Sequence, residues 1–551
     1  MCFLMRASMI LKRKADLMSQ KPIQKQSFLH GAAVLALATF IVKLIGFCYK
    51  IPLVRIIGNQ GYTYFLTAYD IYSVMLTIST AGLPVAMSRL ISQAQTLGSN
   101  AQIRRIYRAS LYIFLAIGTI GSLGMLLFAK QLAIFMEAPD AWVCMLALAP
   151  AVLFICLISS FRGFFQGQSY MTPTAVSQVI EALCKLFLGL GLAWLLLKIG
   201  YSINVAAAGA ILGVTSGTIF SAAYLSVQHR KASAQLSSHG DAPTQSMAQS
   251  MKSLLAIAVP ITIGSAGLQI INLIDSKIVL GQLKNAAGFS QDAAETLRGI
   301  YGACQTLFNM PSAFVVPITV SVIPAITAHL TMKNRTGALK VEESSIRIMS
   351  LLALPCGAGL AVLSGPILQL LYNYSGDTLA AGAPLMAILG ICVIFNCLVL
   401  LTNAIMQAHG NVRTPVINML IGGLVKVVIN YLLVGQPAVN ITGAPIGTLV
   451  CYITITILNL VAMRRMMVRR PRVLSSMVKP LIATVIMAAS AYLSYDLLAL
   501  VLPSQTICCL GAIAIAVIIY GISVLLLRII TLDDCMLLPK GEKIAKLLKI
   551  R

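Results

Sequence analysis

The chain has 551 residues, of which 58% are hydrophobic and only 10% are Asp, Glu, Lys or Arg. Lys and Arg outnumber Asp and Glu by 41 to 16, a formal net charge of +25. Soluble domains carry about 25% charged residues, so this composition excludes a soluble enzyme. Apolar stretches of about 20 residues recur along the chain and indicate helices that span a membrane. The short alternating segments of a membrane β-barrel are absent.

Residues 1–27 contain six Lys and Arg residues, and their apolar stretches are too short for the core of a signal peptide. We interpret 1–27 as a basic tail in the cytoplasm. The apolar stretches that follow predict about fourteen transmembrane helices and an all-α polytopic membrane protein. In chain order they are 29–50, 63–90, 108–129, 141–160, 173–197, 203–227, 253–282, 299–329, 347–371, 382–407, 415–435, 443–463, 474–500 and 505–530. Proline at position 52 is expected to end the first helix.

The connections between these helices differ in charge. Every second connection carries Lys and Arg, as in Arg104, Arg105 and Arg108 or the group Arg464, Arg465 and Arg469. Because cytoplasmic loops are enriched in Lys and Arg, this pattern predicts that both termini lie in the cytoplasm. The positive charge is thereby explained by topology, and we expect no nucleic-acid partner.

The two halves of the chain carry a weak internal repeat. Residues 164–185 resemble residues 405–426: Gln166 matches Gln407, the two Thr-Pro pairs align, and Lys185 matches Lys426. Each unit has an even number of helices, which predicts parallel lobes around a central path. We expect lobes at 28–228 and 251–467, a cytoplasmic linker at 229–250 and two extra helices within 468–530. The tail 531–551 places lysines at helical spacing and is expected to lie on anionic phospholipids of the inner leaflet.

Ionisable residues inside the spans are candidates for a site, because each costs on the order of 3 kcal/mol to insert. The ionisable residues within the predicted spans are Lys43, Asp70, Glu181, Lys185, Asp275, Lys277 and Lys426. Lys50 and Arg55 lie near the outer end of the first span and are candidates as well. Snorkelling to the interface is the alternative for the last two. The tyrosines at positions 49, 62, 64, 69 and 72 are expected to form an interfacial belt, with stacking on a sugar ring as the alternative.

Two of these residues share a helix face. Glu181 and Lys185 stand four residues apart, a spacing that favours mutual neutralisation. Gly422 takes the place of Glu181 in the second repeat, so Lys426 needs a carboxylate from elsewhere, water or an anionic ligand. Lys43, Lys277 and Lys426 are therefore predicted to be unpaired and to form a basic cavity that suits phosphate.

Several other kinds of site are not indicated by the sequence. The five histidines are far apart, and the thirteen cysteines are scattered through apolar segments. A glycine-rich phosphate loop is lacking as well. We therefore expect no metal, no ATP site and no cofactor.

Three segments resemble a known family. They are VKLIGFCYKIPLVRIIGNQGYTYF (42–65), TAGLPVAMSRLIS (80–92) and GFFQGQSYMTPTAVSQVIE (163–181). They are similar to the stage V sporulation protein B group, a polysaccharide-transport branch of the MATE-like flippase superfamily related to the lipid II flippases. The resemblance implies a V-shaped, two-lobed transporter that moves undecaprenyl-pyrophosphate-linked saccharides by alternating access. It also implies a cavity between helices 1, 2, 7 and 8, which favours Lys43, Asp70, Asp275 and Lys277 over Lys426.

The resulting hypothesis is a flippase for a lipid-linked saccharide in the cytoplasmic membrane of a bacterium, without enzymatic activity. Glu181, Lys185, Gln166 and Gln407 are secondary site candidates, and cell-wall synthesis enzymes are candidate partners. A cation-coupled multidrug antiporter is the alternative. A membrane glycosyltransferase is disfavoured, because its chemistry needs paired carboxylates and sizeable loops.

Overall fold

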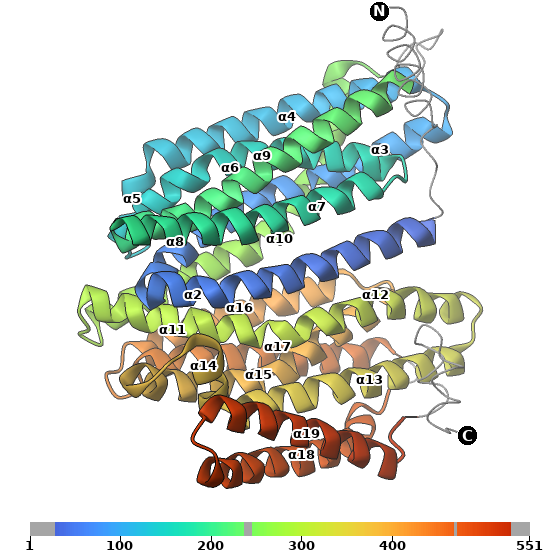
Figure 1. Ribbon diagram of the computed structural model, residues 1–551. Helices are drawn as coiled ribbons and strands as arrows, with labels where there is room; N and C mark the ends of the chain where they lie inside the picture. The colour runs from blue at the N-terminus through green and yellow to red at the C-terminus, as the bar shows by residue number, and fades with distance from the viewer. Residues whose placement is uncertain (1–27, 236–244, 468–470, 531–551) are drawn as a thin grey trace, which may run out of the picture.

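The computed structural model describes residues 28–235, 245–467 and 471–530. The predicted tails at 1–27 and 531–551, and part of the predicted linker, lie outside the described residues. Within them the chain forms helices and no β-strand. Most helices run roughly parallel to one another along the length of the molecule (Figure 1). Among the described residues, thirteen helical stretches are long and apolar enough to cross a membrane.

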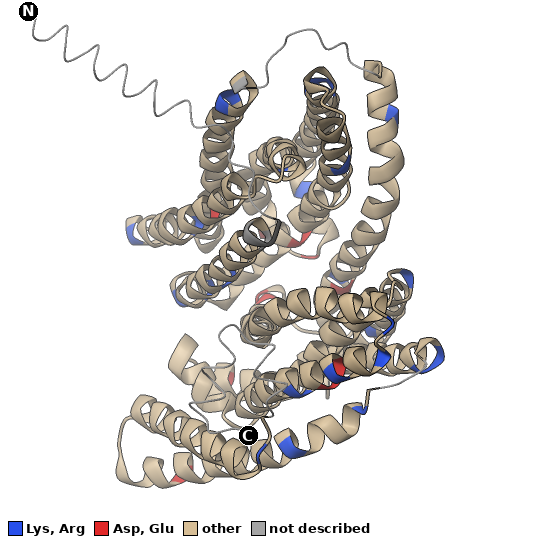
Figure 2. Ribbon diagram, turned by 90° about the vertical axis from the view of Figure 1, so that its right-hand side faces the viewer, with Lys and Arg blue, Asp and Glu red and all other residues tan. Residues whose placement is uncertain are grey.

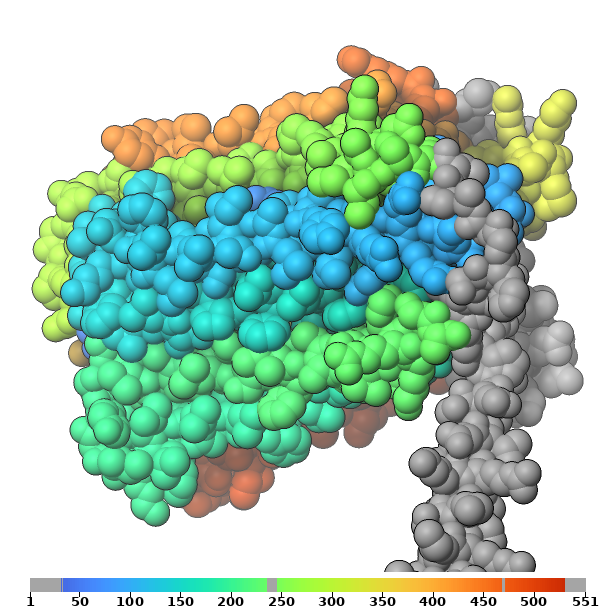
Figure 3. Space-filling view, turned by 90° about the horizontal axis from the view of Figure 1, so that it is seen from above, coloured from blue at the N-terminus to red at the C-terminus, as the bar shows by residue number. Residues whose placement is uncertain are grey.

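The first body comprises the helices between residues 83 and 235. A π-helical turn at Lys185–Gly189 joins two of them, and a 3-10 turn at Pro139–Ala141 precedes α6. Seen from above, α4 and α9 form much of its surface and run along nearly the whole molecule (Figure 3). The helices are α3 (Leu83–Thr96), α4 (Asn100–Leu127), α5 (Ala129–Phe135), α6 (Trp142–Gly167), α7 (Thr172–Cys184), α8 (Leu190–Ile199) and α9 (Ile203–Gln235).

The second body comprises the helices between residues 291 and 526. Its last two helices pack on α13 and α14 at the edge of the body. A 3-10 turn at Asn440–Thr442 precedes α17. The helices are α11 (Gln291–Phe308), α12 (Met310–Thr331), α13 (Arg335–Val362), α14 (Ser364–Tyr372), α15 (Gly376–Ala408), α16 (Arg413–Val434), α17 (Gly443–Met466), α18 (Val473–Val501) and α19 (Gln505–Leu526).

Two long helices connect the bodies. α2 (Phe28–Thr80) packs against α6, α7 and α9 of the first body and against α11 and α12 of the second. α10 (Met247–Asn285) packs against α3 and α4 on one side and α16 on the other. Figure 2 shows the two bodies as separate groups of helices, with Lys and Arg at several of the helix ends that face the viewer. The space between the bodies is therefore bounded by α2 and α10.

The first apolar stretch, Ala33–Thr96, is 64 residues long, far more than one crossing needs. The backbone of α2 breaks at Gly58, where φ is 69° and ψ is 178°, and the chain turns back there. This break divides the stretch into two crossings. The thirteen stretches therefore correspond to fourteen crossings, the number that the sequence predicts. The expectation that Pro52 ends the first helix is wrong, because α2 continues through Pro52 and bends at Gly58 instead.

The connections between the long helices lie at the two ends of the molecule. The start of α2, the α12–α13 turn and the end of α19 lie at the same end (Figure 1). We call it the inner end, since the connections predicted to be cytoplasmic gather there, and call the opposite end the outer end. The Thr-Pro pairs of the sequence repeat lie in the first turns of α7 and α16, where proline needs no hydrogen-bond partner for its nitrogen.

The backbone at Gly58 generates the first prediction. A residue with a Cβ is strained at this φ and ψ by about 1–3 kcal/mol. No atom lies within 4 Å of a Cβ built there, so a clash adds nothing to this strain. Gly58→Ala should therefore lower the thermal stability of the detergent-purified protein, measured by differential scanning fluorimetry.

Gly46→Ala is the matched control. Gly46 lies in the same helix, also with open space around a built Cβ, and alanine is favoured there by about 1 kcal/mol. This control should melt at the same temperature as the wild type or higher. Equal melting of the two variants would show that the turn at Gly58 does not depend on glycine.

Candidate functional site

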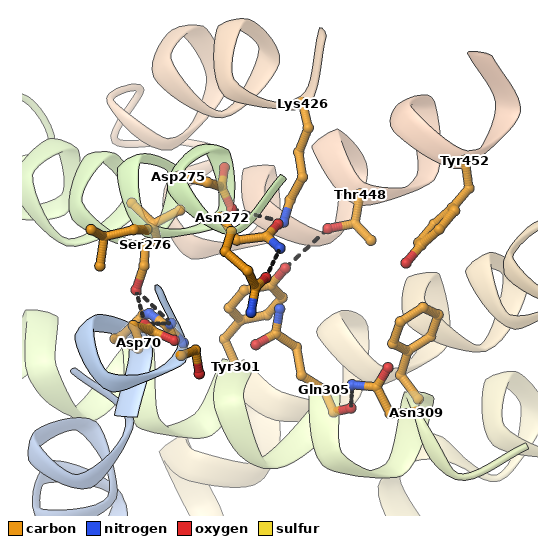
Figure 4. Close-up of a pocket in the computed structure, with 16 residues that line it drawn as sticks. Asp70, Asn272, Asp275, Ser276, Tyr301, Gln305, Asn309, Lys426, Thr448 and Tyr452 are labelled. Atoms are coloured by element: carbon orange, nitrogen blue, oxygen red, sulfur yellow. Dashed lines mark hydrogen bonds and ion pairs between the residues drawn. The ribbon is translucent and has the colours of Figure 1, made fainter. Parts of the chain in front are cut away.

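A cavity of about 270 Å³ lies between the two connecting helices, α2 and α10, and the second body. It is bounded by the second half of α2, the middle of α10, α11, α16 and α17 (Figure 4). Polar side chains dominate its wall. The lining residues are Asp70, Ser73, Gln269, Asn272, Leu273, Asp275, Ser276, Val279, Arg298, Tyr301, Gln305, Phe308, Asn309, Lys426, Thr448 and Tyr452.

The wall formed by α16 holds a buried ion pair. The Lys426 ammonium lies 2.7 Å from Oδ2 of Asp275 on α10, and Asn430 donates its amide N–H to Oδ1 of Asp275 at 2.5 Å. Lys426 and Asn430 are four residues apart and therefore share one face of α16. The prediction that Lys426 is unpaired is wrong, because α10 supplies the carboxylate. Of the alternatives for Lys426, a carboxylate from elsewhere in the fold is the one observed.

The opposite wall holds a second polar cluster. Ser276 donates its hydroxyl hydrogen to Oδ2 of Asp70 at 2.6 Å, and Nη2 of Arg298 donates to Oγ of Ser276 at 2.9 Å. The same Nη2 lies 3.6 Å from Oδ2 of Asp70. Nη1 of Arg298 is buried and has no hydrogen-bond partner. Arg298 is thus a largely buried guanidinium, 8% exposed, with donor capacity left over.

Sequence reasoning missed Arg298. The predicted span 299–329 leaves Arg298 just outside the membrane-spanning segment, whereas α11 begins at Gln291. The Ser290 hydroxyl caps α11 by accepting from the N–H of Ala293, and Asp292 stands in the first turn. Serine followed by an acidic residue is a usual start of a helix, and this signal could have moved the boundary.

The remaining lining is neutral and rich in hydrogen-bonding groups. Side-chain amides come from Gln269, Asn272, Gln305 and Asn309. The rings of Phe308 and Tyr452 lie on one side with centroids 5.9 Å apart. Two carboxylates, Asp70 and Asp275, face two cations, Arg298 and Lys426. The prediction of a basic cavity is therefore wrong for the described residues, because the formal charges along this wall balance.

The other predicted lysines lie elsewhere. Lys277 is two residues from Asp275 and so points to the opposite face of α10, where its ammonium lies 3.7 Å from the ring centre of Phe135. Lys43 is exposed and borders a second cavity, of about 290 Å³, between α2 and α12. That cavity is otherwise mostly apolar, lined by Leu35, Ala36, Thr39, Phe40, Ala313, Val316, Pro317 and Val320.

The predicted pairing of Glu181 with Lys185 is wrong. Glu181 instead accepts a hydrogen bond from Nη2 of Arg162 on α6 at 2.6 Å. The Lys185 ammonium lies over the rings of Tyr49 and Tyr69. Among the predicted interfacial tyrosines, those at positions 49, 62, 64 and 72 are buried in the core and the one at 69 is partly buried. They pack between helices and do not form a belt.

Four further candidates lie away from the cavity. Arg55 donates to the backbone carbonyls of Leu370 and Leu371 at 2.6 Å each, near the outer end. Gln166 is partly buried at the end of α6, and Gln407 is exposed at the end of α15. Lys50 is partly buried on α2. The structure thus gathers Asp70, Asp275 and Lys426 at one cavity and disperses the other candidates.

Polar contacts join α2 to the second body near its outer turn. Gln60 donates to Asp292 at 2.9 Å and to Glu295 at 3.1 Å, and the Tyr64 hydroxyl donates to Glu295 at 2.8 Å. On the other side, Lys284 at the end of α10 pairs with Glu137 of the first body at 2.9 Å. The two bodies are therefore linked at the outer end.

A family model described as polysaccharide biosynthesis protein matches residues 28–329, more than half of the chain. The chain belongs to the polysaccharide biosynthesis protein family. A second model, described as MatE, matches residues 299–432. Membership of the polysaccharide biosynthesis protein family agrees with the resemblance seen in the sequence and with a multi-pass membrane transporter.

Relatives of this family member cover most of its length. Stage V sporulation protein B of Bacillus subtilis (strain 168) is 27% identical over 526 residues, which are 94% of this chain and 98% of the relative. The lipid II flippase MurJ of the same organism is 25% identical over 452 residues, which are 79% of this chain and 82% of the relative.

Solved structures share the fold. A lipid II flippase MurJ in an inward closed conformation superposes with a TM-score of 0.68 at 15% identity, covering 90% of this chain and 99% of that chain. An inward-facing MATE multidrug transporter superposes with a TM-score of 0.59 at 15% identity, covering 77% and 97%. The fold of this polysaccharide biosynthesis protein family member is thus the V-shaped MATE-like fold that the sequence predicts.

The buried pair predicts coupled effects on stability. Asp275→Asn leaves the Lys426 ammonium buried without a counter-charge, which should lower the free energy of unfolding by roughly 3–5 kcal/mol. Lys426→Met alone should destabilise similarly by isolating Asp275. The double variant removes both charges and should melt closer to the wild type than either single variant in detergent. Strictly additive losses would show that the two side chains do not interact.

Proposed function

We propose that this chain is a flippase that moves a polyprenyl-pyrophosphate-linked saccharide across the cytoplasmic membrane of a bacterium by alternating access. The observation that carries the proposal is the polar cavity bounded by α2, α10 and the second body. It combines a dense set of amides and hydroxyls with a buried arginine, Arg298, whose Nη1 has no partner. A transporter rather than an enzyme is consistent with the names of the relatives.

The lining suits a sugar linked to a phosphate. Side-chain amides donate and accept hydrogen bonds and so match sugar hydroxyls in both roles. The rings of Phe308 and Tyr452 provide an apolar surface beside them. Guanidinium groups bind phosphate through two parallel hydrogen bonds, and the free Nη1 of Arg298 supplies such a donor.

The apolar cavity between α2 and α12 suits the lipid part. Its walls carry Leu35, Phe40, Val316 and Val320, with the Lys43 ammonium at the edge. A polyprenyl chain could remain among such side chains while its head group reaches the polar cavity. In this proposal the Lys43 ammonium, which lines the apolar cavity, attracts the pyrophosphate of the lipid.

The charge balance distinguishes the flippase from a cation-coupled multidrug antiporter. A drug cation needs a carboxylate that is available to it. Here Asp275 is already bonded to Lys426 and Asn430, and Asp70 to Ser276, with Arg298 at 3.6 Å. The relatives named stage V sporulation protein B and lipid II flippase point the same way. Termini in the cytoplasm, anionic phospholipids at the inner leaflet and cell-wall synthesis enzymes as partners remain predictions from the sequence.

The test is translocation of fluorescent lipid II by the purified protein in vesicles. Protein-containing vesicles should expose lipid II of the shielded leaflet to a membrane-impermeant quencher faster than empty vesicles. Arg298→Ala and Arg298→Gln should slow translocation about 10- to 100-fold, because one charge-assisted hydrogen bond contributes about 1.5–3 kcal/mol.

Arg413→Ala is the matched control, since Arg413 is exposed at the start of α16 and outside the cavity. It should translocate lipid II at the wild-type rate. If the wild type moved neither lipid II nor any other polyprenyl-linked glycan, the flippase proposal would be wrong. Activity with another glycan alone would reassign the saccharide.

Lys43 and Lys277 provide a second comparison. Lys43→Ala removes the cation at the edge of the apolar cavity and should lower the rate of translocation in the same vesicles. Lys277→Ala removes an ammonium that packs on Phe135 outside the polar cavity and should leave the rate near that of the wild type. The reverse order of effects would place the pyrophosphate path on the other face of α10.

A further inference from the structure

The two lysines related by the internal repeat have different surroundings. Lys426 of the second body is paired with the carboxylate of Asp275. Lys185 of the first body lies instead among three rings of α2. Its ammonium is 4.9 Å from the ring centre of Tyr49, 4.8 Å from that of Tyr69 and 5.7 Å from that of Phe65. Cation–π attraction acts within about 6 Å, so all three rings contribute.

No ion pair joins Lys185 to a carboxylate in the part of the chain that the structure describes. Glu181, one turn earlier, is held by Arg162, which also donates from Nε to the hydroxyl of Ser177 at 3.0 Å. The other charged group nearby is Lys50 on α2, which has the same sign. The rings are therefore the main stabilising partners of this ammonium.

The cage formed by Tyr49, Phe65 and Tyr69 is held by the surrounding protein. Tyr49 is fully buried and donates its hydroxyl hydrogen to the carbonyl of Ala210 at 3.3 Å. Phe65 stacks between Tyr62 and Tyr69, with ring centres 6.0 and 5.8 Å away. These contacts do not involve Lys185, so we expect the cage to keep its shape when the lysine is shortened.

The backbone below the cage leaves little room for adjustment. Lys185 begins the π-helical turn that ends at Gly189. A Cβ built on Gly189 would lie 3.1 Å from the ring of Tyr49, and one built on Gly213 would lie 2.4 Å from the backbone of Gly189. The two glycines therefore permit α9, this turn and the Tyr49 ring to approach closely. Lys185 and Tyr69 are only partly buried, so the cage has an accessible side.

Aromatic cages of this kind recognise ammonium groups that carry alkyl substituents, because ring faces attract charge without needing hydrogen-bond donors. We propose that the first body contains a site for small organic cations and that Lys185 occupies this site from within the chain. A tethered ammonium competes at high effective concentration, so free cations are excluded. Lys185 is thus a specificity-determining residue, and this role rests on the proposed function, in which the substrate is an anion.

The test measures binding of tetramethylammonium to the detergent-purified full chain by saturation-transfer NMR of its methyl protons. Lys185→Ala empties the cage and should produce a saturable signal at least fivefold above that of the wild type. Lys185→Met is the matched control: its side chain refills the cage without charge, and the signal should stay at the wild-type level. Adding Tyr69→Leu to Lys185→Ala should abolish the gain.

Three results would overturn the proposal: equal signals from wild type and Lys185→Ala, equal signals from the Met and Ala variants, or a gain that survives loss of Tyr69. If Lys185→Ala does not fold, Lys185→Ser vacates the same space and takes its place. Translocation of lipid II by the wild type is measured separately. If the wild type does not translocate lipid II but Lys185→Ala binds tetramethylammonium, the flippase proposal is rejected and the cation site is kept. If the wild type translocates lipid II but Lys185→Ala does not bind tetramethylammonium, the flippase proposal is kept and the cation site is rejected.

Discussion

Two neighbouring residues of α10, Asp275 and Ser276, are bonded to side chains on opposite walls of the cavity. The arrangement of the site depends on these bonds. Asp275 is bonded to Lys426 and Asn430 of α16, whereas Ser276 is bonded to Asp70 of α2 and Arg298 of α11. Successive residues of a helix point about 100° apart, so one turn of α10 contacts three other helices. A small rotation of α10 would therefore change both sets of bonds together.

Three pairs of opposite charges lie inside the described part of the protein. Arg162 with Glu181 and Lys426 with Asp275 pair across helices, and Arg298 shares a cluster with Asp70. An unpaired charge at membrane depth is unfavourable by several kcal/mol, so such pairing lets a chain of high net charge keep polar residues in its interior. The unused donor of Arg298 is then a specific feature of the cavity rather than part of a general positive field.

The two lysines aligned by the predicted sequence repeat have different partners. Lys185 and Lys426 align in sequence, yet one is bound by aromatic rings and the other by a carboxylate. The difference follows from the helices that face them. α2 presents tyrosine and phenylalanine to the first body, and α10 presents aspartate to the second.

The sequence alone determined the class of protein, the fourteen crossings and most of the ionisable residues worth examining, because hydropathy and loop charge are properties of each segment by itself. The helical period also requires Asp275 and Lys277, two residues apart, to lie on different faces of one helix. The tertiary structure decided which helix each face meets. In the folded protein Lys426 pairs with Asp275, Glu181 pairs with Arg162, and Arg298 lines the cavity. These partners depend on how helices distant in sequence are rotated and packed against one another. A local sequence pattern does not specify that relative rotation.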